Sequence, residues 1–142
     1  MTTAPPERTA LIVDDEDTLL RLMTRVLEKE NVRVLAAQDA ASARALFDAH
    51  EGEIDLLVLD VMLPDGDGAE TLLPEFVARR PTVRVVVASG DEPPEAVTAE
   101  LTRIGGHFLR KPFAPKDLIR LVREASPSAL PRSSAPAATG PS

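Results

Sequence analysis

Short apolar runs alternate with longer segments of mixed polarity along the first 126 residues of this 142-residue chain. The apolar runs are rich in valine, isoleucine and leucine and lack polar alternation, which is typical of buried strands. They predict strands at 9–13, 32–36, 54–59, 83–88 and 107–110. The segments that follow each run predict helices at 19–29, 40–49, 69–79, 94–104 and from 114 or 115 to 125.

Local signals refine these helices. Asp17 is a candidate N-cap for the first helix, because its carboxylate can accept a hydrogen bond from the first turn. Pro74 lies inside the third helical segment, where it predicts a kink or a late start. Gly105 fits the end of the fourth helix. Proline and glycine also predict a loop at 63–68.

The order of elements is strand then helix, repeated five times. Strands that are apolar on both faces suit a parallel sheet covered by helices on both sides. The sequence therefore predicts an α/β protein with an open, doubly wound (βα)5 five-stranded parallel sheet.

Composition divides the chain into one folded domain and two terminal segments. Residues 127–142 contain four prolines, four serines and four alanines, a composition that buries too little apolar surface to fold. Residues 1–8 include two prolines and predict a flexible N-terminus. We therefore expect one domain at 9–126, followed by a disordered tail or a linker.

Charge and residue usage exclude several classes of protein. The net charge of −7 and an aromatic content of 3% disfavour direct nucleic-acid binding. The absence of cysteine excludes disulfides and thiolate metal sites. No stretch approaches the roughly 18 apolar residues of a membrane span, and the N-terminus does not resemble a signal peptide. We expect a cytoplasmic protein without a membrane partner.

Chemically active side chains stand at the ends of four predicted strands. Asp14 and Asp15 follow the first strand, Asp60 the third, Ser89 the fourth and Lys111 the fifth. Because the carboxyl ends of parallel strands meet at one edge of the sheet, these five side chains are expected to lie together.

This set of groups suits phosphoryl chemistry. Clustered carboxylates raise one another's pKa, and a hard divalent cation relieves their repulsion. Oxygen ligands with room for water favour Mg²⁺, with Mn²⁺ as a substitute. A carboxylate can act as a nucleophile and form an aspartyl phosphate. Mg²⁺ and Lys111 would then neutralise the charge of the transferring group, while Ser89 would donate a hydrogen bond.

The chain resembles the receiver domains of bacterial response regulators, the CheY-like family. The similarity covers about residues 8–126 and is carried by four motifs in order: LIVDDE at 11–16, LVLDVMLPDGDG at 57–68, VASG at 87–90 and FLRKPF at 108–113. The resemblance implies a flavodoxin-like fold with the strand order 2-1-3-4-5. This order is known for CheY-like proteins and is taken over from the resemblance, since the spacing of the elements does not determine it.

The resemblance also implies roles for individual residues. Asp60 matches the phosphoacceptor, and Lys111 matches the lysine that contacts the phosphate. Asp15 matches the acid that binds the metal directly and Asp14 the acid that reaches it through water. Met62 stands where the family uses a main-chain carbonyl as a metal ligand.

Two further positions match the family's conformational switch. Ser89 resembles the hydroxyl that moves toward the phosphate, and Phe108 resembles the aromatic side chain that turns inward with it. The peptide between Lys111 and Pro112 is often cis in the family. Gly90 follows the hydroxyl where the family mostly has alanine or another small residue, which affects the expected phosphate lifetime. Phe108 replaces the commoner tyrosine. We assign no role to His50 or His107.

The function that follows is that of a phosphoacceptor in a two-component phosphorelay. The expected donor is a histidine kinase or a histidine phosphotransfer protein, and the expected output is a change in protein contacts, including a dimer that forms on phosphorylation. The chain would not be an enzyme beyond reacting with small donors and losing its own phosphate. One alternative is an aspartate-nucleophile phosphatase, although Met62 stands where such enzymes usually place a second acid. The other is a receiver-like binding module that is not phosphorylated.

Overall fold

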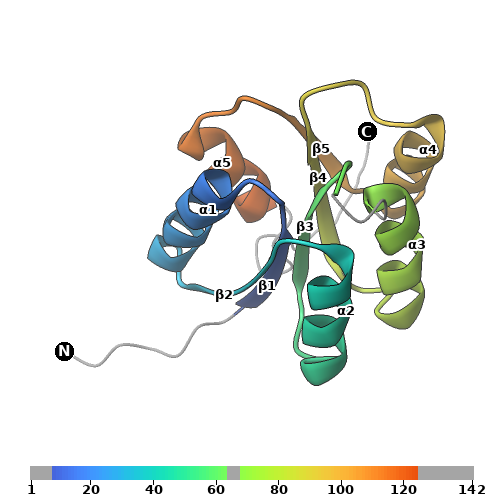
Figure 1. Ribbon diagram of the computed structural model, residues 1–142, viewed down its shortest axis with the longest axis horizontal. Helices are drawn as coiled ribbons and strands as arrows, with labels where there is room; N and C mark the ends of the chain where they lie inside the picture. The colour runs from blue at the N-terminus through green and yellow to red at the C-terminus, as the bar shows by residue number, and fades with distance from the viewer. Residues whose placement is uncertain (1–7, 64–67, 125–142) are drawn as a thin grey trace.

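The computed structural model describes residues 8–63 and 68–124, which form one parallel sheet with helices on both faces (Figure 1). The strand order is β2-β1-β3-β4-β5, and every neighbouring pair is parallel. This confirms the predicted fold class and strand order. The strands are β1 (Arg8–Val13), β2 (Val32–Ala37), β3 (Leu56–Asp60), β4 (Arg84–Ser89) and β5 (His107–Arg110).

Five helices connect and cover these strands. They are α1 (Asp17–Lys29), α2 (Ala40–Ala49), α3 (Ala69–Arg79), α4 (Glu95–Ile104) and α5 (Pro115–Glu124). Helices α1 and α5 lie on one face of the sheet, and α2, α3 and α4 lie on the other (Figure 1). No helix in the described part of the chain is both long and apolar enough to cross a membrane.

Each face of the sheet is sealed by its own apolar layer. On the α2–α4 side, Phe47 and Phe76 are fully buried and stack with ring centroids 4.3 Å apart. On the α1–α5 side, Met23 and Leu118 pack in the layer that includes Val58 of β3. The two layers account for strands that are apolar on both faces. They also hold the carboxyl ends of the strands in fixed positions.

Several element boundaries differ from the sequence prediction. Asp17 is not the N-cap of α1, because the N-cap position is occupied by Glu16, whose side chain makes no capping hydrogen bond. Pro74 lies inside α3 without delaying its start at Ala69. Gly105 ends α4 with a φ of 71°, a left-handed conformation that glycine adopts without a steric penalty.

Some predictions concern residues that lie outside the described part of the chain. These are residues 1–7 of the predicted flexible N-terminus at 1–8, the central part of the loop at 63–68, residues 125 and 126 of the predicted domain, and the predicted tail at 127–142. Strand β1 begins at Arg8, one residue before its predicted start, and β3 begins at Leu56, two residues after its predicted start.

Candidate functional site

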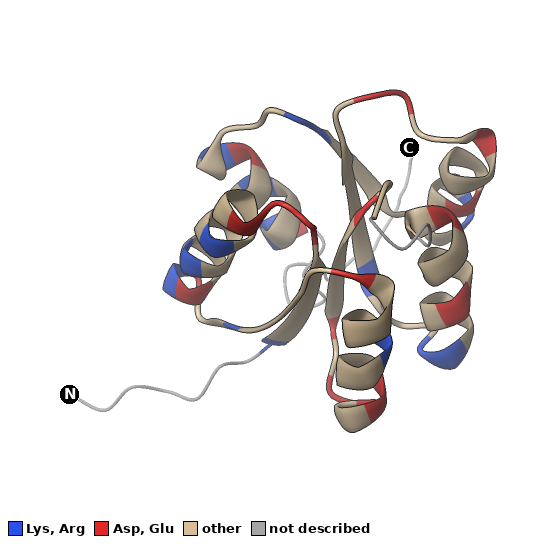
Figure 2. Ribbon diagram, in the orientation of Figure 1, with Lys and Arg blue, Asp and Glu red and all other residues tan. Residues whose placement is uncertain are grey.

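The site lies at the edge of the sheet where the strands end. Acidic segments stand at the ends of β1 and β3 and after β4, and a basic segment stands at the end of β5, all on one side of the molecule (Figure 2). Gly68 packs directly against Val61, the residue that follows β3. A Cβ atom at position 68 would lie 1.7 Å from the carbonyl oxygen of Val61, so only glycine fits there. The start of α3 is thereby held against this edge of the sheet.

Three carboxylates form the acidic part of the site. One oxygen from each of Asp14, Asp15 and Asp60 lies within 4.8 Å of the others. Asp14 is 1% exposed and Asp60 is 7% exposed, whereas Asp15 faces solvent. Such a set of oxygen donors, open to water on one side, fits the ligand preference of a hard divalent cation such as Mg²⁺. The predicted acidic cluster is therefore present.

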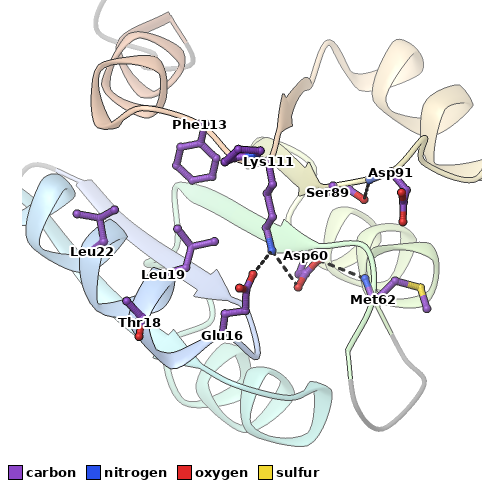
Figure 3. A pocket seen from close by; sticks show the side chains of 12 residues that line it. Glu16, Thr18, Leu19, Leu22, Asp60, Met62, Ser89, Asp91, Lys111 and Phe113 are labelled. Atoms are coloured by element: carbon purple, nitrogen blue, oxygen red, sulfur yellow. Dashed lines mark hydrogen bonds and ion pairs between the residues drawn. The ribbon is translucent and has the colours of Figure 1, made fainter.

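The side chain of Lys111, which follows β5, reaches toward Asp60 and Glu16 (Figure 3). Its Nζ atom lies 2.9 Å from Oδ2 of Asp14, 3.3 Å from Oδ2 of Asp60 and 3.3 Å from Oε1 of Glu16. The peptide between Lys111 and Pro112 is cis, as the resemblance implied. The lysine therefore places one positive charge among three negative ones, and the site keeps a net negative charge.

The close packing of these charges shifts the pKa of Asp60 and the pKa of Lys111. Burial, followed by the negative charge of Asp14, raises the pKa of Asp60 to about 6, although Lys111 and the Met62 amide act in the opposite direction. Burial alone would lower the pKa of Lys111. The hydrogen bond and charge of Asp14, with smaller contributions from Asp60 and Glu16, outweigh burial and raise that pKa above its usual value.

The raised pKa of Asp60 predicts that Asp60→Asn stabilises the metal-free protein at neutral pH. The unfolded chain loses this proton near pH 3.8 and the folded chain near pH 6, so wild-type stability falls as pH rises through that window. The shift corresponds to at most about 3 kcal/mol at roughly 1.4 kcal/mol per pKa unit, and side-chain relaxation reduces it. We expect a gain of about 1–2 kcal/mol above pH 6 and none below about pH 4.

Urea unfolding in the presence of EDTA, followed by far-ultraviolet circular dichroism at pH 4, 5, 6 and 7.5, measures this difference. Asp17→Asn is the matched control, because it makes the same acid-to-amide change at an exposed position in the first turn of α1. Its stability should follow that of the wild type across the series. A metal-free Asp60→Asn protein less stable than the wild type at pH 7.5 would contradict the assigned electrostatics.

Main-chain amides orient the remaining polar groups. The N–H of Met62 donates to Oδ1 of Asp60 over 3.3 Å, and the Met62 side chain points into solvent with 73% of its surface exposed. Ser89 is buried, and its Oγ accepts a hydrogen bond from the N–H of Asp91 over 3.1 Å. The Ser89 hydroxyl is therefore held by its own loop.

A cavity of about 610 Å³ opens beside Asp60. Asp60, Ser89 and Lys111 line it together, as the sequence predicted. Sequence reasoning missed the rest of the lining, which includes Glu16, Thr18, Leu19, Leu22, Asp91 and Phe113 (Figure 3). The helical spacing of the leucines in α1 predicts an apolar face of the helix and gives no sign of a cavity.

Phe108 does not line this cavity. It stands beside Val87 in the β4–β5 register and packs partly against the apolar layer on the α2–α4 side. Its exposed part lines a second hollow with Leu101 of α4 and Arg110 of β5. Strand β4 therefore lies between Phe108 of β5 and Asp60 of β3.

The comparisons with known proteins identify the family. Residues 10–123 match the family described as response regulator receiver domain. The chain is 34% identical over 113 residues to the transcriptional regulatory protein CpxR of Klebsiella pneumoniae, covering 80% of this chain and 47% of the relative. It is 33% identical over 122 residues to CssR of Bacillus subtilis, covering 82% and 50%. The chain therefore belongs to the response regulator receiver domain family.

Solved structures support the same fold. A CheY-like receiver domain protein from Methanospirillum hungatei superposes with a TM-score of 0.71 at 26% identity, covering 82% of this chain and 91% of that chain. The HemR receiver domain of Leptospira biflexa superposes with a TM-score of 0.76 at 23% identity, covering 90% and 99%. The chain spans about half the length of the curated relatives CpxR and CssR. It is a receiver domain of a two-component response regulator.

Proposed function

We propose that Asp60 accepts a phosphoryl group from a partner histidine kinase or histidine phosphotransfer protein. A carboxylate oxygen of Asp60 attacks the phosphorus atom, a new P–O bond forms, and the P–N bond of the donor phosphohistidine breaks. The electron pair leaves with the imidazole nitrogen. The observation that carries this proposal is the position of Asp60, a buried carboxylate 3.3 Å from the Lys111 ammonium and close to two further acids.

The surrounding residues have complementary roles in this proposal. Asp14, Asp15 and Asp60, with the main-chain carbonyl of Met62, would hold Mg²⁺, for which Mn²⁺ can substitute. The ion, when bound, offsets the charge of the acids and of the phosphoryl oxygens. Lys111 contacts a phosphoryl oxygen from the other side of the site. The chain itself acts as an acceptor that reacts with small donors and loses its own phosphate, without turning over a separate substrate.

Phosphorylation then changes the surface on the α4–β5–α5 side of the domain. The Ser89 hydroxyl leaves the Asp91 amide and donates to the phosphoryl group, and Phe108 moves from its partly exposed position into the space that is freed. This shifts the population between two conformations with different affinities for a partner or for a second copy of the chain. The hollow lined by Phe108, Leu101 and Arg110 supports this proposal because it leaves the Phe108 side chain partly exposed beside α4.

The domain limits belong to the same proposal. The chemistry is assigned to a receiver domain at 9–126, with the output passed on through protein contact in the cytoplasm and without direct binding to nucleic acid. The relatives CpxR and CssR are transcriptional regulatory proteins. By analogy, the phosphorylated receiver would regulate an output domain or a partner protein.

Intact-protein mass spectrometry tests the proposed reaction. Incubation with acetyl phosphate and Mg²⁺ should add the mass of one phosphoryl group to the wild type, and EDTA should prevent the addition. Asp60→Asn should show no addition under the same conditions. Equal addition to wild type and Asp60→Asn, or no addition to the wild type, would overturn the proposal. Consumption of the donor without any phosphorylated protein would favour a phosphatase.

A further inference from the structure

Glu16 occupies the N-cap position of α1 without capping the helix. Its backbone has the extended conformation of an N-cap residue, with φ −84° and ψ 105°, but its side chain makes no hydrogen bond to the first turn. Glutamate is not among the residues that favour this position, which are serine, threonine, aspartate and asparagine. The identity of residue 16 is therefore not explained by the stability of α1.

The side chain of Glu16 points instead toward Lys111 (Figure 3). Oε1 lies 3.3 Å from the lysine Nζ, and the Glu16 N–H donates to Oδ1 of Asp14 over 2.9 Å, which fixes the backbone beside the site. With Asp14 and Asp60, Glu16 completes a set of three carboxylates around the ammonium group. An ammonium group has three N–H donors, so each can face one carboxylate.

Glu16 differs from the other two partners of Lys111 in its surroundings. Asp14 and Asp60 are buried and belong to the acidic cluster, whereas Glu16 is outside that cluster and its side chain is 62% exposed. An exposed ion pair is weak, because both groups remain hydrated and salt screens them. Glu16 can therefore release Lys111, but until it does, it occupies one of the donors that a phosphoryl group needs.

We propose that Glu16 competes with the incoming phosphoryl group for Lys111 and thereby slows phosphorylation of Asp60 by small dianionic donors. This inference rests on the proposed function of Asp60 and adds a positioning residue to it. A dianion such as acetyl phosphate must displace the Glu16 carboxylate from the ammonium group while approaching a site that is already negative. A donor with a smaller net negative charge, such as phosphoramidate, is attracted less strongly to the Lys111 ammonium group and is repelled less by the carboxylates of the site.

The chemistry at Asp60 is the same for both donors. With acetyl phosphate, the P–O bond to acetate breaks as the P–O bond to Asp60 forms, and acetate leaves with the electron pair. With phosphoramidate, the P–N bond breaks and ammonia leaves. The effect of Glu16 is therefore confined to the approach of the donor and to the contact with Lys111.

Rate constants for phosphorylation of Glu16→Gln test the proposal at saturating Mg²⁺, with intact mass as the measurement. Glutamine keeps the size of the side chain and removes its charge. We expect the rate constant with acetyl phosphate to rise about two- to fivefold, the size of an exposed charge interaction. The rise with phosphoramidate should be smaller. When Lys111 is already replaced by alanine, adding Glu16→Gln should raise the rate constant with acetyl phosphate by only a small fraction of that factor. The reason is that Glu16 acts by occupying the lysine.

Asp17→Asn is the matched control, since it removes the same charge one residue along the chain. Asp17 pairs with Arg21 and Gln38 and not with Lys111. Its rate constants should remain at the wild-type level. An unchanged or slower Glu16→Gln, an equal rise in Asp17→Asn, or a full rise in the Lys111→Ala background would overturn this inference while leaving the role of Asp60 intact. A wild type that reacts with neither donor would overturn the proposed function, and this inference with it.

Discussion

Lys111→Ala is expected to slow phosphorylation of Asp60 by acetyl phosphate about 100-fold at saturating Mg²⁺, since removing one group that stabilises transition-state charge typically costs a factor of roughly 10²–10³. The Nζ atom lies 3.3 Å from Asp60 and its side chain is only 14% exposed, so water replaces it poorly. The rate constant is measured from intact mass over time.

The control for this prediction is Lys116→Ala, which removes the same charge from an exposed position in α5. Its rate constant should stay within about twofold of the wild type, the effect of a distant, screened surface charge. Circular dichroism shows whether Lys111→Ala remains folded, and Lys111→Arg provides a second variant that keeps the positive charge near Asp14. A loss of less than threefold in folded Lys111→Ala, or an equal loss in Lys116→Ala, would contradict the role assigned to Lys111.

Phe76→Ala is expected to lower the free energy of unfolding by about 3–5 kcal/mol, the usual cost of deleting a buried aromatic ring. Phe76 of α3 is fully buried and stacks on Phe47 of α2 with an angle of 3° between the rings. The Arg79 guanidinium lies 4.7 Å from the centroid of the Phe47 ring and pairs with Asp48 and Glu51. The deletion therefore opens a cavity where α2 and α3 meet on the sheet.

Urea unfolding followed by circular dichroism measures this loss, because the chain has no tryptophan or tyrosine to report by fluorescence. Leu22→Ala is the control: Leu22 is 37% exposed, and its truncation should cost less than about 1 kcal/mol. Similar midpoints for the two variants, with unchanged denaturant dependence, would show that the α2–α3 layer is not the packed core described above.

The fold was predictable because β1, β3 and β4 carry the same signal, whereas β2 and β5 are more polar and partly exposed. Runs of valine, isoleucine and leucine without polar alternation are typical of strands covered on both faces, as in a parallel sheet between helices. Helices α2 and α3 and strand β5 have the predicted bounds. The strand order came from the resemblance, because spacing alone does not determine which strands are neighbours.

The convergence of Asp14, Asp60, Ser89 and Lys111 was also predictable. Each stands at the end of a strand, and parallel strands bring such positions to one edge. The partners of each group were not predictable, because they depend on distances of a few tenths of an ångström. The bond from the Asp91 amide to Ser89 is an example, since it follows from the local turn and not from residue type.

The first turn of α1 shows where the sequence misled. Asp17 is a common N-cap residue and was assigned that place, but the helix begins with Asp17 already inside it. Glu16 therefore occupies the N-cap position, and its contact with Lys111 could not be read from the sequence. Leu22 of α1 is 37% exposed and lines the cavity, and helical spacing does not distinguish such a residue from one in the core.

The position of the phosphoryl group tests the central claim most directly. Reduction of the phosphorylated wild type with borohydride converts an aspartyl phosphate to homoserine, which peptide mass spectrometry then locates. We expect homoserine at position 60 and at no other acid of the site. Homoserine at position 14 or 15, or a phosphoryl group found on His50 or His107, would contradict the assignment of Asp60 as the acceptor.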